Sequence, residues 1–484
     1  MKMNGLNAAL PIGPEVSSAE LDTLTLDKKQ KNLGMVRCLL YTAIAFFVFF
    51  VSITINGKSQ IVFGWIYNYF ADLLGTAGYW LLVAIVGGNL FANLYSKYID
   101  KGKRFHKLHH YYEHDSIFVS FLYALGFIYI VVYAMDKTIP AFTGPEIIVG
   151  PNTGDSVVPP IVMGVLWIIL VGAFFMPMLL DYGAIEFVGA LLEPLMRPFF
   201  HVPGKAALDA TASFLSSSSL GVIITSRLYH REIYTQKEAV TIATCFSAVS
   251  VGFAYLVIST AGMEHSFLTI YVISFLLSFI LEAIMVRIPP LKNKKNCYVN
   301  GREQTEKERS QDARFTKDIF SRGAQRAVKR GATAYPLGKS IFLSLKDSMM
   351  VVPKVITMLS AIGISAMILA QYTPIFKWIG FAFQPLLYLL RIPEPALVAP
   401  SLPVGIAEMF LPVLIIANKI NEIPEMSRFF ICVVSMVQII FFSETGTVML
   451  TTKLPVKFKE LVLLFFMRTL IAMPFAALAA HLFC

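Results

Sequence analysis

The sequence predicts an all-α polytopic membrane protein with about nine transmembrane helices, two re-entrant hairpins in an inverted repeat, and interfacial amphipathic helices. Three observations lead to this prediction. The 484 residues are 56% hydrophobic and only 15% charged, whereas a soluble chain of this length carries far more charge. Most apolar segments are long enough to cross a bilayer. Two others are interrupted by serine, glycine or proline, at corresponding places in two halves of the chain.

Charge and cysteine usage narrow the functional classes. The net charge of +10 does not predict nucleic-acid binding, because the basic residues lie in a few loops between apolar segments, as cytoplasmic loops do. Five scattered cysteines without a CxxC pair predict neither a disulfide framework nor a metal site; they are Cys38, Cys245, Cys297, Cys432 and Cys484. The sequence has no phosphate-binding loop and no nucleophile triad. We therefore expect neither an enzyme nor an ATP-driven pump, and no cofactor.

The N-terminal part is predicted to be an arm followed by scaffold helices. Residues 1–34 are polar and lack the apolar core of a signal peptide, so we expect a cytoplasmic arm. Residues 35–160 are expected to form the scaffold, with spans at 35–55, 75–95 and 116–135 and an aromatic interfacial segment at 61–73. The loop 96–115 is rich in basic residues and is placed inside, whereas 136–160 is expected outside.

Residues 161–287 are predicted to form the first of two repeats. Its elements are a span at 161–181, an amphipathic surface helix at 182–201, a re-entrant hairpin at 206–227, and spans at 238–260 and 266–287. The hairpin is predicted because four consecutive serines lie between apolar ends. Unpaired polar groups are costly in hydrocarbon, and a helix–break–helix that dips into the bilayer and returns can surround its break with protein or water.

The second half of the chain is predicted to repeat this order in the opposite direction. Residues 288–346 are strongly basic and are expected to form a cytoplasmic loop. The second repeat, 347–484, comprises a span at 351–371, a surface helix at 374–391, a hairpin at 396–420, and spans at 428–450 and 460–482. With two hairpins that return to their own side, every basic loop falls on one side. The N-terminus is then cytoplasmic and the C-terminus outside.

Glu408 is the first candidate for binding a substrate. It lies near the middle of the second hairpin, between Pro403 and Pro412. An ionisable side chain within an apolar segment costs about 2.5–3.5 kcal/mol on insertion scales, so it indicates a functional site. A carboxylate there can accept hydrogen bonds from the vicinal hydroxyls of a sugar or pair with an ammonium. A structural ion pair with another helix is the alternative.

Glu444 is the second candidate, and it lies in the sequence FFSETGTVML. Ser443, Thr445 and the following glycine predict an unwound turn in the middle of the span 428–450. The side chains of Glu444, Ser443 and Thr445 are expected to line the substrate site. Gln438 precedes the turn by nearly two helical turns. It is expected to share the cavity or, alternatively, to hydrogen-bond a neighbouring helix.

Two serine-rich places complete the predicted site. Hydroxyls and helix N-terminal amides at the first hairpin tip are expected to contact the substrate; the residues are Ser216, Ser217, Ser218 and Ser219. Ser247 and Ser250 form a matching interruption in the next span, where hydroxyls and freed carbonyls suit a hard cation such as sodium. Close helix packing through small residues is the alternative at both places.

A histidine-rich loop is the remaining feature. His106, His110 and His114 have the i, i+4 spacing of a zinc site. Because they lie in a basic loop at the membrane edge, we interpret them as part of a solvated electrostatic anchor rather than as metal ligands.

The order of span, surface helix, hairpin and two spans, repeated in inverted form, resembles the nucleoside-recognition Gate family and the related concentrative nucleoside transporters. The runs SFLSSSSLGVIITSRLYHR and FSETGT resemble those of bacterial YjiH-type Gate proteins, and the resemblance covers roughly 161–482. Nucleoside transporters of this kind carry Gln, Thr and Glu at the first hairpin tip, where this sequence has serines. The acidic residue of their second hairpin resembles Glu408. The resemblance implies sodium or proton coupling and a homo-oligomer, a trimer or dimer.

Together these features predict an ion-coupled secondary active transporter in the bacterial inner membrane. It would carry a small polar solute, nucleoside-like or amino-acid-like, between the two hairpins. The alternative is a non-transporting Gate-domain membrane component that assembles with a partner protein, with the basic loop 288–346 as its docking surface.

Overall fold

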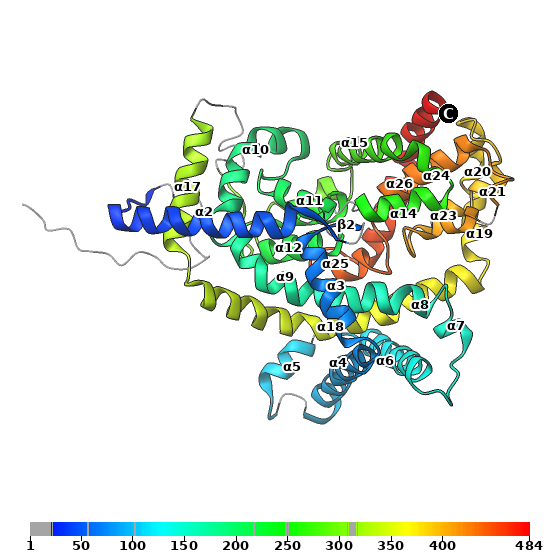
Figure 1. Ribbon diagram of the computed structural model, residues 1–484, viewed down its shortest axis with the longest axis horizontal. Coiled ribbons are helices and arrows are strands. Elements are labelled where there is room, and N and C mark those ends of the chain that lie inside the picture. The colour runs from blue at the N-terminus through cyan, green and yellow to red at the C-terminus, as the bar shows by residue number, and fades with distance from the viewer. Residues whose placement is uncertain are drawn as a thin grey trace, which may run out of the picture.

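The computed structural model describes residues 21–484 apart from a few short gaps, which are 22, 56–57, 101–102, 114, 216–217, 247–248, 250, 307, 309–315, 317 and 418. The described chain is almost entirely helical, as Figure 1 shows. Within these residues the one sheet is an antiparallel pair of short strands, in which Ser52 lies opposite Ile61. The predicted all-α membrane class is confirmed.

The N-terminal scaffold begins with a helix that is capped by its own side chains. Asp27 accepts a hydrogen bond from the backbone of Gln30, whose side chain accepts one from the Asp27 N–H in return. The elements of this part are α2 (Lys28–Phe50), β1 (Ser52–Ile55), β2 (Lys58–Ile61), α3 (Val62–Leu74), α4 (Ala77–Leu94), the π-helix η1 (Tyr95–Asp100), α5 (His106–Tyr112) and α6 (Ile117–Thr138).

The first predicted repeat contains two pairs of helices that are each separated by a short interruption. Its elements are α7 (Glu146–Val149), α8 (Gly154–Val157), η2 (Val158–Met163), α9 (Gly164–Leu180), α10 (Ala184–Phe200), α11 (Ala206–Leu215), α12 (Ser218–His230), α13 (Gln236–Cys245), α14 (Val251–Thr260), η3 (Glu264–Ser266) and α15 (Phe267–Met285). The first pair, α11 and α12, is the predicted hairpin, and its two helices pack side by side.

The second predicted repeat follows a connecting region that contains η4 (Leu291–Asn293) and α17 (Ile319–Thr333). Its elements are α18 (Leu337–Tyr372), α19 (Ile375–Phe381), α20 (Gln384–Leu389), α21 (Pro395–Val398), α22 (Ser401–Val404), α23 (Leu411–Ala417), α24 (Glu425–Gln438), α25 (Thr445–Thr451) and α26 (Phe458–Phe483). Helices α22 and α23 correspond to the predicted second hairpin and also pack against each other.

Seven helices of the described chain are long and apolar enough to cross a membrane, against about nine predicted spans. They are Lys28–Phe49, Ala77–Asp100, Ile117–Thr138, Glu146–Leu180, Glu264–Met285, Leu337–Tyr372 and Phe458–Phe483. The other two predicted spans, 238–260 and 428–450, are each divided into two shorter helices. Both divisions fall where serine and glycine weaken the helix, which is where the sequence predicted weak points.

The described helices bury two large hydrophobic clusters, which meet near the interruption in the span 428–450, and a small third cluster around Tyr112 and Tyr123. The larger cluster centres on α9 and α18 and includes side chains of α2, α10, α12, α13 and α25. The smaller one comprises side chains of α14, α15, α24 and α26. In Figure 1, α18 runs the length of the larger part, with α9 on one side and α4 and α6 on the other. Phe441 belongs to the smaller cluster and Phe442 to the larger, so the chain between α24 and α25 lies at their junction.

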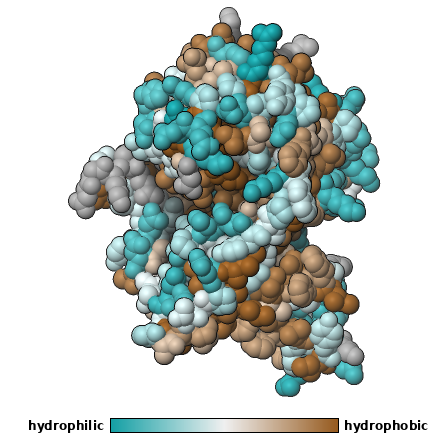
Figure 2. All heavy atoms as spheres, turned by 90° about the vertical axis from the view of Figure 1, so that its right-hand side faces the viewer, coloured by the Kyte–Doolittle hydropathy of each residue, from teal (hydrophilic) through white to brown (hydrophobic). Residues whose placement is uncertain are grey.

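Large apolar side chains also cover the outside of the molecule. Figure 2 shows them gathered at the height at which α4 and α6 lie in Figure 1. Exposed residues of these two helices include Phe91, Ile117, Phe118, Phe121 and Ile128. In water such a surface is unfavourable, whereas in a bilayer it faces lipid chains.

Candidate functional site

The chain between α24 and α25 runs beside the interruption of the second hairpin. The Phe442 N–H donates to the Ile406 carbonyl at 2.8 Å, and the Ser443 N–H donates to the Ala407 carbonyl at 2.9 Å. Non-helical backbone at membrane depth is tolerated only where such partners satisfy it. The two interruptions therefore stabilise each other, and they bring the side chains of the second hairpin next to those of the unwound turn.

Two acidic side chains meet at this junction. Glu408 lies between α22 and α23 and is buried, and Glu444 is the residue immediately before α25. The two carboxylates lie within electrostatic range of each other. Among the described residues, the hydrogen-bond partners of the two carboxylates are serine hydroxyls and backbone N–H groups, not cationic side chains. The predicted alternative of a structural ion pair for Glu408 thus has no partner in the described chain.

A serine hydroxyl contacts each carboxylate. Ser443 Oγ donates to Glu408, so the unwound turn contacts the second hairpin through its side chain as well as its backbone. Ser219 Oγ donates to Glu444, although the two residues are 225 positions apart in the chain. Ser219 lies in the first turn of α12, at the end that faces the first hairpin's interruption. The two hairpins and the unwound turn consequently converge on one pair of carboxylates.

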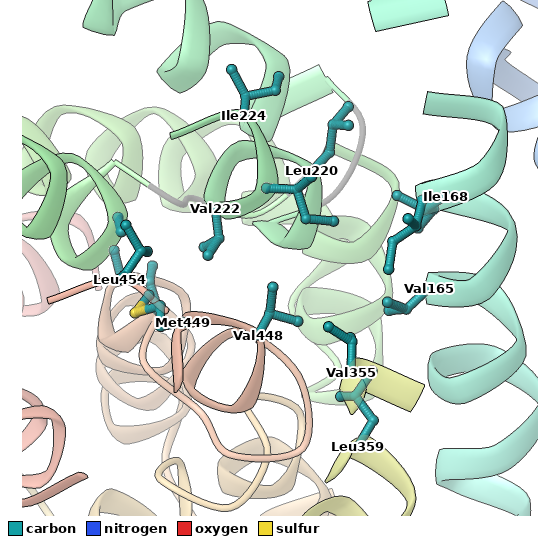
Figure 3. Packing of buried hydrophobic residues seen from close by; sticks show 14 of the residues in the cluster. Val165, Ile168, Leu220, Val222, Ile224, Val355, Leu359, Val448, Met449 and Leu454 are labelled. Atoms are coloured by element: carbon teal, nitrogen blue, oxygen red, sulfur yellow. The ribbon is translucent and has the colours of Figure 1, made fainter. Parts of the chain in front are cut away.

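Apolar packing fixes the first hairpin in this position. Figure 3 shows the side chains of α12 facing those of α25, with α9 and α18 beside them; the residues are Leu220, Val222, Val448, Met449, Val165, Ile168, Val355 and Leu359. Ser226 adds a polar contact farther along α12, because its Oγ donates to the Thr452 carbonyl at 2.9 Å. Apolar side chains therefore pack α12, which carries Ser219, against α25, which follows Glu444 directly.

Close approach of its two helices explains the composition of the first hairpin. A Cβ added to Gly221 would lie 1.7 Å from Ser213 Oγ, so a larger residue at this crossing would force the Ser213 side chain to move. Asp209 of α11 is buried, and its Oδ2 accepts a hydrogen bond from Thr225 Oγ1 of α12 at 3.0 Å. Ser218 is buried beside Ser219 at the start of α12. The predicted site residues Ser216 and Ser217 lie outside the described residues.

Gln438 and Thr445 hold the unwound turn rather than contacting the carboxylates. Gln438 Nε2 donates to the Leu402 carbonyl at 2.8 Å and to Thr469 Oγ1 at 3.1 Å, which ties the end of α24 to the second hairpin and to α26. Thr445 Oγ1 donates to the Ile439 carbonyl at 2.8 Å. For Gln438, these contacts correspond to the alternative stated from the sequence, a hydrogen bond to a neighbouring helix.

The remaining predicted residues lie elsewhere. Ser247 and Ser250, predicted to bind a coupling cation, fall outside the described residues, between α13 and α14. His106 and His110 lie on α5, where His110 Nδ1 is 2.7 Å from the Glu113 carboxylate, and His114 is not among the described residues. The described chain holds no group of three His, Cys, Asp or Glu side chains placed to bind a metal ion.

Sequence reasoning did not single out two further buried ionisable residues. Glu282 of α15 and Arg468 of α26 are both fully buried, and Arg468 donates to the carbonyls of Val437 and Cys245. Both interrupt otherwise apolar runs, LSFILEAIMV and LFFMRTLIAM. A lone charge within a span was the signal that would have identified them.

Comparison with known proteins gives the family of this chain. The model of the family described as "Gate: Nucleoside recognition" matches residues 162–264. An uncharacterized protein of Alkalihalophilus pseudofirmus is 36% identical over 340 residues, which are 70% of this chain and 72% of that protein. The chain belongs to the Gate family. The match to the Gate model extends from the start of α9 to η3 and so includes the first hairpin and Ser219.

A second relative matches a shorter part of the chain. The sporulation integral membrane protein YlbJ of Bacillus subtilis is 35% identical over 85 residues, which are 16% of this chain and 21% of that protein. No solved structure matches the chain. The relationship supports a multi-pass membrane protein of the Gate family.

Proposed function

We propose that this Gate protein is an ion-coupled secondary active transporter of a small polar solute. The observation that carries the proposal is the convergence of both hairpins and the unwound turn on Glu408 and Glu444. Paired interrupted helices in two halves of a membrane protein are typical of transporter binding sites. Ionisable side chains at such a place are costly unless they serve a function.

The chemistry of the pair defines the class of solute. Two carboxylates without a cationic neighbour among the described residues favour a ligand that brings hydrogen-bond donors or positive charge. Vicinal sugar hydroxyls of a nucleoside and the ammonium of an amino acid both meet this requirement. Ser219 and Ser443 now occupy one acceptor position on each carboxylate. A bound solute would replace these hydroxyls or share the carboxylates with them.

The hairpins supply the moving parts in this proposal. Ser219 connects the first hairpin to the site by a side-chain contact, whereas the second hairpin is joined to the unwound turn by two backbone hydrogen bonds as well. We assign the first hairpin, which contacts the site through Ser219, the role of closing it. The positions of the basic loops support a cytoplasmic location for this hairpin in a bacterial inner membrane.

Solute uptake into proteoliposomes tests the proposal. The panel comprises radiolabelled uridine, other nucleosides, lysine, neutral amino acids and short peptides, each with an inward sodium gradient, an inward proton gradient or none. Gradient-stimulated nucleoside uptake would assign the carboxylates to ribose hydroxyls, and amino-acid uptake would assign them to an ammonium. Silence across the panel under both gradients contradicts a transport function.

The alternative function is a non-transporting membrane component that works with a partner protein. The relative YlbJ is named a sporulation integral membrane protein, a description that does not mention transport. The region 288–346 is then its docking surface. Part of that region is occupied within the chain, because α17 packs against α2 and α10. Removing residues 309–315 would impair a partner-dependent function and leave solute uptake unchanged.

A further inference from the structure

Glu282 and Arg468 form a second buried charged group, separate from the carboxylate pair. Both side chains are fully buried, and both oxygens of Glu282 lack a hydrogen-bond partner in the described structure. No described cation lies within the 4.0 Å ion-pair distance of its carboxylate. Arg468 is nevertheless close enough to interact with Glu282 electrostatically. The pair is thus near but not in contact.

Arg468 is held by the ends of two interrupted helices. Its Nε donates to the Val437 carbonyl in the last turn of α24, and its Nη2 lies 3.4 Å from the carbonyl of Cys245, the last residue of α13. Helix C-termini carry unsatisfied carbonyls and partial negative charge, so a fixed cation stabilises both ends. Arg468 consequently connects the interruption in each repeat. Its Nη1 has no partner among the described residues.

This arrangement determines which of the two side chains carries a proton. A guanidinium stays charged at any physiological pH. An ionised carboxylate that is buried without a partner costs several kcal/mol. With Arg468 engaged by two carbonyls, Glu282 is more stable as the neutral acid. It becomes a stable carboxylate once Arg468 swings onto it.

Other charged groups around α15 are already engaged. Of the described elements that pack against α15, α13 brings Cys245 into electrostatic range of Glu282. On α10, Arg197 pairs with Glu193 at 2.8 Å and with Glu238 at 2.5 Å. On α24, Arg428 Nη1 donates to the carbonyls of Ala261 and Gly262, away from Glu282. Arg468 on α26 is therefore the charged group that controls Glu282.

We propose that Glu282 is the proton-binding site of this protein, and hence that the coupling ion is a proton. This inference rests on the proposed transport function. When the interrupted helices move, the guanidinium leaves the two carbonyls and pairs with Glu282, whose O–H bond breaks as the proton passes to water on the open side. On return, the carboxylate takes a proton from water on the other side and Arg468 again binds the helix ends.

Infrared spectroscopy of the full-length purified protein tests the protonation step without any solute. Wild type at neutral pH is expected to show the C=O stretching band of a protonated carboxylic acid. Glu282→Gln removes one such acid, so its difference spectrum against wild type should contain that band. Glu264→Gln, which changes an exposed carboxyl before α15, is the matched control, and its difference spectrum should not contain that band. If Glu282→Gln does not remove the C=O stretching band of a protonated carboxylic acid, the proposal is overturned.

Transport measurements with radiolabelled uridine and lysine test the coupling step. Glu282→Gln mimics the protonated state permanently, so exchange of internal for external solute should continue, whereas accumulation driven by a proton gradient should fall to the equilibrium level. Proton-driven accumulation equal to wild type would overturn the proposal. If wild type moves neither solute, nor any of the panel, the proposed function and the coupling both fail, and the infrared result still decides the protonation of Glu282.

Discussion

Gly204 shows how closely the first hairpin is fitted to α10. Its N–H donates to Glu193 Oε2 at 2.5 Å, which satisfies a carboxylate oxygen on the surface helix. A Cβ added to Gly204 would lie 2.1 Å from the Gly189 carbonyl oxygen and 2.4 Å from the Glu193 nitrogen. These neighbours are backbone atoms, which cannot rotate away as a side chain can. The base of the hairpin therefore needs a residue without a side chain.

We expect Gly204→Ala to destabilise the protein by about 1–3 kcal/mol, because overpacking a closely fitted contact forces the backbone to shift. The measurement is the thermal unfolding midpoint of the purified protein in detergent. Gly88→Ala on α4 is the matched control, since a Cβ there meets nothing within 4 Å. Because alanine favours the helix more than glycine does, this variant should keep or slightly raise the wild-type midpoint. Equal midpoints for both variants would contradict the close fit at Gly204.

At the residue scale, the sequence predicted the members of the site better than their contacts. Glu408 and Glu444 could be identified because a charge next to proline, glycine or serine within an apolar segment is conspicuous. That Ser219 reaches Glu444 could not be predicted, since it depends on how α12 packs against α25. Glu282 and Arg468 were missed because the runs LSFILEAIMV and LFFMRTLIAM contain no proline or glycine to mark a break.

Helices α10 and α17 and the base of the first hairpin are joined by buried ion pairs. Glu186 of α10 accepts from Arg330 Nε of α17 at 2.9 Å and lies 3.6 Å from Lys205 Nζ at the hairpin base. Burial alone would raise the pKa of Glu186, but the charges of Arg330 and Lys205 lower it below its ordinary value of 4.5. The ionised form is therefore the one that the folded state stabilises.

The sign of this shift gives a pH dependence. Because the pKa of folded Glu186 lies below 4.5, its stabilising effect is present above that pH and is lost as the pH falls through the folded pKa. Glu186→Gln should lower stability at neutral pH by about 3–5 kcal/mol, the cost of breaking a buried pair. Its unfolding midpoint should then change less than that of wild type on acidification.

Unfolding midpoints at neutral and acidic pH check this prediction, with Glu264→Gln as the control because that carboxyl is exposed. The control should follow wild type at both pH values. A Glu186→Gln protein with the wild-type acid response would show that the ion pairs do not hold the hairpin base.

At the element scale, the sequence predicted helix–break–helix segments at 206–227, 396–420 and 428–450, because serine, glycine and proline mark the places where a helix is weakened. The exact position of a break depends on tertiary contacts. The sequence predicts the turn around Ser443 and Thr445, whereas the chain leaves the helix at Ile439, which has the left-handed φ of 42°, and resumes it at Thr445. Hydrogen bonds from Thr445 and to Ile406 and Ala407 decide this position.

At the scale of the whole molecule, the described residues combine seven membrane-length apolar helices with two interrupted ones, and the charge distribution predicts how they are oriented. The basic loops predict that the C-terminus lies outside and the region 288–346 inside. The chain carries natural probes for this topology. Cys484 is exposed at the C-terminus, Cys297 is partly exposed in the connecting region, and Cys245 and Cys432 are buried.

A membrane-impermeant maleimide applied to intact cells should therefore label Cys484 and leave Cys297 unlabelled until the membrane is permeabilised. Peptide mass analysis of the purified protein distinguishes the labelled sites. Cys484→Ala is the control and should abolish the labelling of intact cells. Labelling of Cys297 from outside would reverse the predicted orientation.

The central claim is that Glu408 and Glu444 hold one solute, and uptake by isosteric variants tests it most directly. Uptake of whichever panel solute wild type transports is compared among wild type, Glu408→Gln, Glu444→Gln and the exposed control Glu264→Gln, after size-exclusion chromatography confirms folding. Hydrogen bonds to charged groups contribute about 1.5–3 kcal/mol, so each site variant should lose about tenfold to a hundredfold in uptake, and the control should lose nothing. Folded site variants that both transport like wild type would contradict the claim.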